Sequence, residues 1–245
     1  MRLPRTACAP RPARLSIAGV KSEPLIELRS VSCARTEAGV RARIAEVSLA
    51  IEAGSVTLLV GETGCGKNLL LRLLGLLEVP DSGEVIFAGQ PTAQLTDDAR
   101  VELRTHACGY LFSSPFLLAQ FSALENIAMP VFKISRLSPE EVRARTEELM
   151  AFAGLTEFAE AKELPPFLQK RVALARSLAN EPKVLFVENL DEMIAGDVAF
   201  RELLHAAAER FGVAVVAAAL PSCVARMGER RIEVAGGRLA SAVTP

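Results

Sequence analysis

The stretch GETGCGKN at residues 61–68 constrains the fold of this chain more than any other feature. The spacing G-x-x-x-x-G-K binds phosphate through backbone N–H groups and a lysine, and it needs a strand entering the loop and a helix leaving it. The continuously apolar segment 55–61 precedes the loop, and the leucine-rich segment 68–80 follows it with helical spacing and a closing proline. The sequence therefore predicts a strand, a phosphate loop and a helix within an α/β domain.

The candidate phosphate-binding residues are those of the loop itself. The glycines let the backbone approach phosphate closely, and Lys67 adds a point charge. The pattern then asks for Ser or Thr, whose hydroxyl holds magnesium, but this chain carries Asn68. Because asparagine is longer than serine and magnesium demands near-ideal octahedral geometry, we expect weakened metal binding. Nucleotide is predicted to contact Gly61, Glu62, Thr63, Gly64, Cys65, Gly66, Lys67 and Asn68.

The remaining segments alternate between strand and helix patterns. Two segments with apolar and polar residues in alternation, 25–32 and 43–54, predict antiparallel strands joined by a turn at 35–40. The further elements that we predict are strands at 84–89, 183–189 and 213–220, a mainly helical stretch at about 95–165, helices at 138–155, 168–182 and 200–212, and a hairpin at 230–240. Ser138 and Glu141 predict a capping box at the start of one helix. Apolar strands that alternate with helices predict a mostly parallel sheet covered on both faces.

The composition limits the partners of the chain. Half of the 245 residues are apolar, so a sizeable core is expected. The charges nearly cancel, with 28 basic and 29 acidic residues, so we expect no nucleic-acid partner. No window reaches the ~20 apolar residues that cross a bilayer, and the five scattered cysteines with two histidines predict no zinc site. Residues 1–24, rich in Arg and Pro, are expected to form a flexible tail.

Three further segments give the chain a specific resemblance. They read SLAIEAGSVTLLVGETGCGKNLLLRLLGLLEVPDSGEVIFAGQ, GYLFSSPFLLAQFSALENIAMPV and QKRVALARSLANEPKVLFVEN. In wording and order, residues 25–240 resemble the ATP-binding subunit of ABC transporters, nearest to the lipoprotein-release and macrolide-export kind. The resemblance implies an α/β fold, the P-loop NTPase fold of ABC type, over residues 25–245. It also implies an N-terminal antiparallel β subdomain, a helical subdomain at about 95–180, and ATP with Mg as ligands.

The resemblance also shows which family residues are altered. The Walker B aspartate corresponds to Glu188, which with Asn68 would form a weak Mg site, and the general-base glutamate corresponds to Asn189. The Q-loop glutamine corresponds to Ser113 and the switch histidine to Ala219. An asparagine accepts no proton at neutral pH, so no catalytic residue is expected at these positions. Nearby carboxylates, Asp191 and Glu192, are the alternative source of a base.

The signature loop and the adenine contact are altered as well. Where the family has Leu-Ser-Gly-Gly-Gln, residues 164–168 read LPPFL, and the two prolines have no N–H to offer a phosphate. The aromatic residue that stacks on adenine in the family falls near Arg35, for which we weigh stacking on a base against a solvated loop position.

These changes predict a catalytically degenerate subunit, a pseudo-ATPase that binds ATP and Mg weakly or not at all. It would serve assembly or regulation with an integral membrane permease subunit, at the cytoplasmic face of the inner membrane. Its second partner would be another ABC ATP-binding subunit, either itself or a competent sister. Phe116, Leu117 and Phe121, in an unusually apolar segment, are the predicted permease contacts. The alternatives are a slow but active transport ATPase, and a purely structural module that binds no nucleotide.

Overall fold

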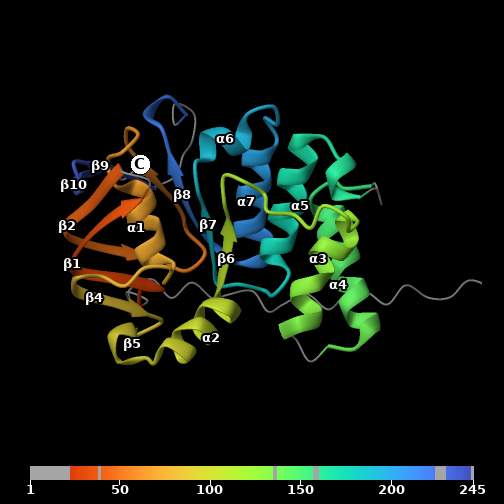
Figure 1. Ribbon diagram of the computed structural model, residues 1–245, viewed down its shortest axis with the longest axis horizontal. Helices are drawn as coiled ribbons and strands as arrows, with labels where there is room; N and C mark the ends of the chain where they lie inside the picture. The colour runs from red at the N-terminus through yellow and green to blue at the C-terminus, as the bar shows by residue number, and fades with distance from the viewer. Residues whose placement is uncertain (1–22, 38–39, 135–136, 157–159, 224–229, 244–245) are drawn as a thin grey trace, which may run out of the picture.

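The computed structural model describes residues 23–37, 40–134, 137–156, 160–223 and 230–243, so most of the predicted tail at 1–24 lies outside the described residues. Two sheets organise these residues, and helices lie between and beside them (Figure 1). Among the described helices, none combines the length and the apolar character that a bilayer span requires.

The first sheet is antiparallel and has the order β2-β1-β4-β5. Its strands are β1 (Ile26–Glu37), β2 (Val40–Ile51), β4 (Ser82–Phe87) and β5 (Gln90–Pro91). The predicted antiparallel pair is confirmed, but β1 is longer than predicted, and β2 has the predicted length and begins three residues earlier. The register continues through Arg35 opposite Ala42, so Arg35 is a strand residue and not a loop residue.

The second sheet has six strands in the order β10-β9-β3-β8-β7-β6. Its strands are β3 (Val56–Val60), β6 (Cys108–Leu111), β7 (Val184–Val187), β8 (Ala214–Ala219), β9 (Arg230–Ala235) and β10 (Arg238–Val243). All neighbours pair in parallel except the C-terminal hairpin of β9 and β10. Strand β6 corrects the prediction of a mainly helical stretch, because its four residues gain their order from pairing with β7, which no local pattern reveals.

Helices cover both faces of the six-stranded sheet. They are α1 (Lys67–Leu74), α2 (Asp97–Ala107), α3 (Ala123–Ile134), α4 (Pro139–Phe152), α5 (Pro166–Leu178), α6 (Leu190–Ile194) and α7 (Phe200–Phe211), with short 3-10 turns at Thr92–Gln94, Ala161–Glu163 and Pro221–Cys223. The predicted capping box of Ser138 and Glu141 is confirmed at the start of α4. Helix α1 ends before Pro80, because Gly75 terminates it and Leu76 takes a positive φ of 59°.

The core has two parts, one on each face of the parallel strands. Leu58 packs on the face covered by α3, α4, α5 and α7, whereas its neighbour Leu59 packs on the face covered by α1 and the antiparallel sheet (Figure 1). This alternation confirms the predicted α/β sheet with two covered faces. The carboxyl ends of β3, β6, β7 and β8 lie at one edge, where parallel sheets usually place their ligand sites.

Candidate phosphate-binding site

A pocket of about 320 Å³ lies at the carboxyl edge of the parallel strands. It is lined by Ala42, Thr63, Gly64, Gly66, Lys67, Asn68, Leu69, Asn189, Asp191, Glu192 and Leu220. These residues come from the phosphate loop with the start of α1, from the segments that follow β7 and β8, and from β2. The structure therefore brings five of the eight predicted loop residues to one pocket wall.

The loop has the backbone that a phosphate cradle needs. Gly66 has a φ of 102°, and a Cβ there would lie 2.6 Å from the Arg43 carbonyl oxygen, so the position requires glycine. Helix α1 follows with no side-chain cap and no acidic residue in its first turn. Its first N–H groups and its dipole are therefore available to an anion. The loop is held from behind by Gly237, whose N–H donates to the Cys65 carbonyl at 2.9 Å.

Lys67 supplies the positive charge of the pocket. Lys67 is only 6% exposed, and its Nζ donates to the carbonyl oxygen of Glu62 at 3.2 Å. An ammonium group has three protons, so this contact leaves donors for a phosphate oxygen. The residues present in the loop thus fit the phosphates of a nucleotide.

The altered positions meet in one hydrogen-bonded chain. Asn68 Nδ2 donates to Asn189 Oδ1 at 3.2 Å, and Asn189 Nδ2 donates to Ser113 Oγ at 2.7 Å and to Glu192 Oε1 at 3.3 Å. Asn189 adopts a left-handed backbone, φ 44°, directly before α6, which turns its side chain back toward the loop. Neutral amide and hydroxyl groups therefore meet at the three positions that the sequence resemblance assigns to the metal ligand, the general base and the Q-loop glutamine.

Two of the nearby carboxylates, Glu188 and Asp191, are placed differently from each other. Glu188 follows β7, donates its N–H to the Leu111 carbonyl at 2.9 Å, and is not among the residues that line the pocket. Asp191 lines the pocket, but its Oδ1 accepts the backbone N–H of Leu220 at 3.2 Å. That contact directs one carboxylate oxygen of Asp191 to the end of β8.

The residue after β8 requires a correction. The sequence comparison put the switch position at Ala219, but this residue is the last of β8, is 0% exposed and packs in the core. Leu220, one residue later, lines the pocket. Successive residues leaving a strand face opposite sides, so a shift of one position exchanges core and pocket. The conclusion for chemistry is unchanged, because neither residue can hold a proton or a phosphate.

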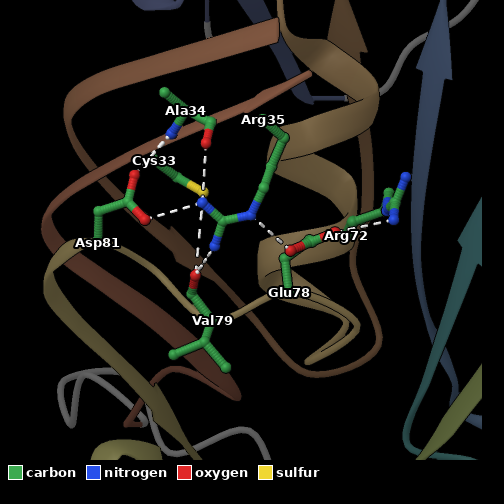
Figure 2. A network of polar contacts seen from close by, with 7 residues as sticks. All are labelled: Cys33, Ala34, Arg35, Arg72, Glu78, Val79 and Asp81. Atoms are coloured by element: carbon green, nitrogen blue, oxygen red, sulfur yellow. Dashed lines mark hydrogen bonds and ion pairs between the residues drawn. The ribbon is translucent and has the colours of Figure 1, made fainter. Parts of the chain in front are cut away.

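Arg35 lies on strand β1 and does not line the pocket, and its side chain is 30% exposed. Figure 2 shows its guanidinium facing the segment that joins α1 to β4. The guanidinium donates hydrogen bonds to Glu78 at 2.9 Å, to Asp81 at 2.8 Å and to the Val79 carbonyl at 2.5 Å. The hydrogen bond from Arg35 holds the pKa of the Asp81 carboxyl below its usual range. Ala42, the strand partner of Arg35, is the residue that reaches the pocket, and it offers only a methyl group to a base.

The altered signature segment forms the start of α5. Pro166 is the first residue of the helix, a position that proline favours, so the helix begins two residues earlier than predicted. The Pro165 carbonyl accepts the N–H groups of Leu168 at 2.9 Å and Gln169 at 3.1 Å. Phe167 remains 38% exposed. The N–H groups at the end of this segment are thus used within the turn, and the prolines have none.

An apolar loop lies between β6 and α3. Phe116 is 67% exposed and holds a φ of 43°, whereas Leu117 and Phe121 are half-buried. Arg176 fixes the loop from below by donating to the carbonyls of Pro115 at 2.7 Å and Phe116 at 2.8 Å. Burial lowers the pKa of Arg176. The predicted contact residues are therefore together, but only Phe116 presents most of its surface to solvent.

Asn126 is a second support of this loop that sequence reasoning missed. It is 1% exposed, accepts the Leu118 N–H at 2.8 Å and donates to the carbonyls of Leu118 at 3.1 Å and Phe121 at 3.2 Å. An asparagine within the apolar pattern of a helix was the available signal, because a buried amide must find partners.

Comparisons with known proteins agree with this fold. The model of the family "ABC transporter" matches residues 44–195. The dimeric structure of MJ0796, a bacterial ABC transporter cassette, is 31% identical with a TM-score of 0.78, covering 89% of this chain and 98% of that one. A post-hydrolysis dimer of the ATP-binding cassette MJ0796, bound to ADP and Pi, is 28% identical with a TM-score of 0.76 and the same coverage. CbiO1 from Clostridium perfringens, part of the ABC transporter complex cbiONQ, is similar in fold, with 21% identity, a TM-score of 0.80, and coverage of 91% of this chain and 90% of that one.

Proposed function

Because this chain belongs to the ABC transporter family, we propose that it is an ATP-binding cassette that has lost catalysis and serves the assembly and regulation of a membrane permease complex. The observation that carries the proposal is the amide of Asn189 at the general-base position, hydrogen-bonded to Ser113 and Asn68. The wording of the three segments that carry the resemblance supports the lipoprotein-release and macrolide-export kind.

Several losses act together against hydrolysis. Members of this family normally bind ATP with magnesium, and a carboxylate then takes the proton of the attacking water. A neutral amide cannot do so, and the loss of a general base costs about 10²- to 10⁴-fold in rate. Asp191 is a poor substitute because one of its oxygens is held by the Leu220 N–H. The pocket residue after β8 is leucine, which donates nothing to a terminal phosphate.

The signature segment extends the loss to a second subunit. In the family, two cassettes meet head to tail, and each site combines the phosphate loop of one with the signature loop of the other. The structures of the MJ0796 cassette are dimeric, which supports a paired arrangement for this chain. Since this chain lacks both a base at Asn189 and donors at Pro165 and Pro166, neither composite site in a dimer is complete. This holds for a homodimer and for a pair with a competent sister.

The exposed loop around Phe116 supports a permease as the partner. A phenylalanine that is 67% exposed on a backbone of positive φ, in a loop held by the buried Asn126 and the partly buried Arg176, is costly unless it contacts something. The segment corresponds to the family's groove for a cytoplasmic helix of the membrane subunit. We therefore place the chain at the cytoplasmic face of the cell membrane, bound peripherally to a permease.

Steady-state phosphate release tests the loss of catalysis. We expect the purified chain with ATP and magnesium to release phosphate at the rate of its Lys67→Ala variant, because no group at residue 189 can take a proton. The same result is expected when the chain is supplied with the native membranes. Turnover comparable with that of a working transporter, and lost in the Lys67→Ala variant, would contradict the proposal.

Membrane association tests the proposed docking surface. We expect Phe116→Asp to release the chain from native membranes, so that the ratio of pelleted to soluble protein falls at least about tenfold. The reason is that a charge at the centre of an apolar contact is left unpaired. Val101→Asp is the matched control, since Val101 is exposed (46%) on α2. Both variants are expected to melt as the parent does. Two results would contradict a permease contact at Phe116. One is that Phe116→Asp pellets with native membranes as the parent does, and the other is that the parent binds protein-free lipid vesicles as well as it binds native membranes.

A further inference from the structure

The side-chain amides of Asn68 and Asn189, which are hydrogen-bonded to each other, have one allowed orientation. The Glu192 carboxylate can only accept, so the group of Asn189 that faces Glu192 at 3.3 Å must be its NH₂. The carbonyl oxygen of Asn189 therefore faces Asn68, and Asn68 must turn its own NH₂ toward it at 3.2 Å. The Asn68 Oδ1 atom is consequently directed into the protein, where it is buried without a hydrogen-bond partner among the described residues. The anionic residue Glu192 thus sets the direction of every donor in the chain.

This orientation does not fit magnesium. The ion requires oxygen ligands at about 2.0–2.1 Å in an octahedron. At the position where the family presents a hydroxyl oxygen, this protein presents the N–H groups of Asn68. The oxygen of Asn189, which is hydrogen-bonded to Asn68, accepts one of them. Turning Asn68 to offer its oxygen would place two carbonyl oxygens against each other. The Asn68 amide therefore opposes a cation at this position. The pocket also contains two carboxylates, but one oxygen of Asp191 accepts the Leu220 N–H and one oxygen of Glu192 accepts from Asn189.

The same orientation suits an anion. Asn68 lines the pocket, and only one of its two amide protons is used by Asn189. Lys67 and the first turn of α1, which lacks acidic residues and a side-chain cap, lie beside it. Three donors of different kinds, an ammonium, backbone N–H groups and an amide, thus surround the place where the phosphates of a nucleotide lie in this fold.

The geometry points to a nucleotide site that holds the polyphosphate chain without a divalent cation, the Asn68 amide taking the place that magnesium occupies in related cassettes. This inference concerns the regulation of the same site and rests on the proposed loss of catalysis, because a site that does not hydrolyse has no need of the metal. Nucleotide occupancy would then follow the total nucleotide concentration, whatever the concentration of magnesium.

Calorimetric titration of the full chain with ATP tests the inference, once in magnesium buffer and once in EDTA. We expect the two Kd values to agree within about threefold, where every tenfold change in Kd corresponds to about 1.4 kcal/mol. In Asn68→Ser, which exchanges the amide donor for a hydroxyl ligand, we expect EDTA to weaken binding at least tenfold relative to magnesium. Lys67→Ala is the control that assigns the heat to the phosphate loop.

Three outcomes would overturn the inference: binding of the parent chain that is more than tenfold tighter with magnesium, no binding in either buffer, and an Asn68→Ser variant as indifferent to magnesium as the parent. Thermal unfolding of each variant shows whether it is folded. The proposed loss of catalysis is judged separately, because its failure shows as phosphate release in magnesium buffer and not as a change in Kd.

Discussion

ATP turnover is expected to rise by about 10²- to 10⁴-fold over the parent chain when Asn189→Glu is combined with repair of both the phosphate loop and the signature segment. The repaired chain carries Asn68→Ser, Leu220→His and the sequence LSGGQ at residues 164–168. Each change alone is expected to leave phosphate release at background. The reason is that the base and the signature donors act on the same phosphate from two different subunits, and removing either one stops the reaction.

The partial repairs are the informative controls. Asn189→Gln in the repaired background keeps the length of glutamate without its charge, so it is expected to lose the gained turnover. Such effects are strongly non-additive when groups act as a unit. The exchange at residues 164–168 replaces Pro166, which begins α5. The melting temperature of the variant must therefore be recorded together with its rate of ATP turnover. Turnover restored by Asn189→Glu alone would show that the proline-blocked segment is no obstacle, and the proposed function would need revision.

The fold was predictable where a local pattern carries its own physical meaning. The glycine spacing at 61–68 required a strand before it and a helix after it, and the structure has β3 and α1 in these places. Strand β6 was not predictable in this way, because CGYL owes its extended form to pairing with β7. Arg35 was misplaced for a related reason. Its ion pairs with Glu78 and Asp81 join residues more than 40 positions apart, so no local pattern indicates them.

The site was predictable in its members but not in its contacts. The resemblance placed Asn68, Ser113 and Asn189 at one site, and the structure joins them by hydrogen bonds. The orientation of the amides depends on Glu192, which was considered only as a replacement base. The position after β8 was shifted by one residue, since alanines in a buried strand give no pattern that separates core from pocket. Tertiary partners, rather than composition, decide these details.

Arg171→Ala is expected to be the most destabilising single substitution that we propose, at about 3–5 kcal/mol in the free energy of unfolding. Arg171 on α5 donates to both oxygens of Asp197, at 2.5 and 2.9 Å, and the two side chains are only 18% and 6% exposed. The pair ties α5, whose first turn contains part of the altered segment 164–168, to the segment after α6. Removing the arginine leaves the buried Asp197 carboxylate without its ion-pair partner, which costs more than the pair itself contributes. A chain of this size should then melt roughly 6–20 °C lower, at about 2–4 °C per kcal/mol.

The pH dependence and a matched control complete this prediction. The hydrogen bonds from Arg171 hold the pKa of Asp197 below its usual range. A depressed carboxyl pKa stabilises the fold above the unfolded value of about 3.9, and this contribution is lost as the pH falls through the folded value. The difference in the free energy of unfolding between the parent and Arg171→Ala, measured in urea, should therefore be full at neutral pH and should narrow below about pH 4.

Arg143→Ala is the matched control. It removes an exposed pair with Glu147, at 2.8 Å, and should cost no more than about 0.5 kcal/mol. Equal losses in the two variants, or a gap that persists in acid, would mean that the pair does not act through the charge of Asp197.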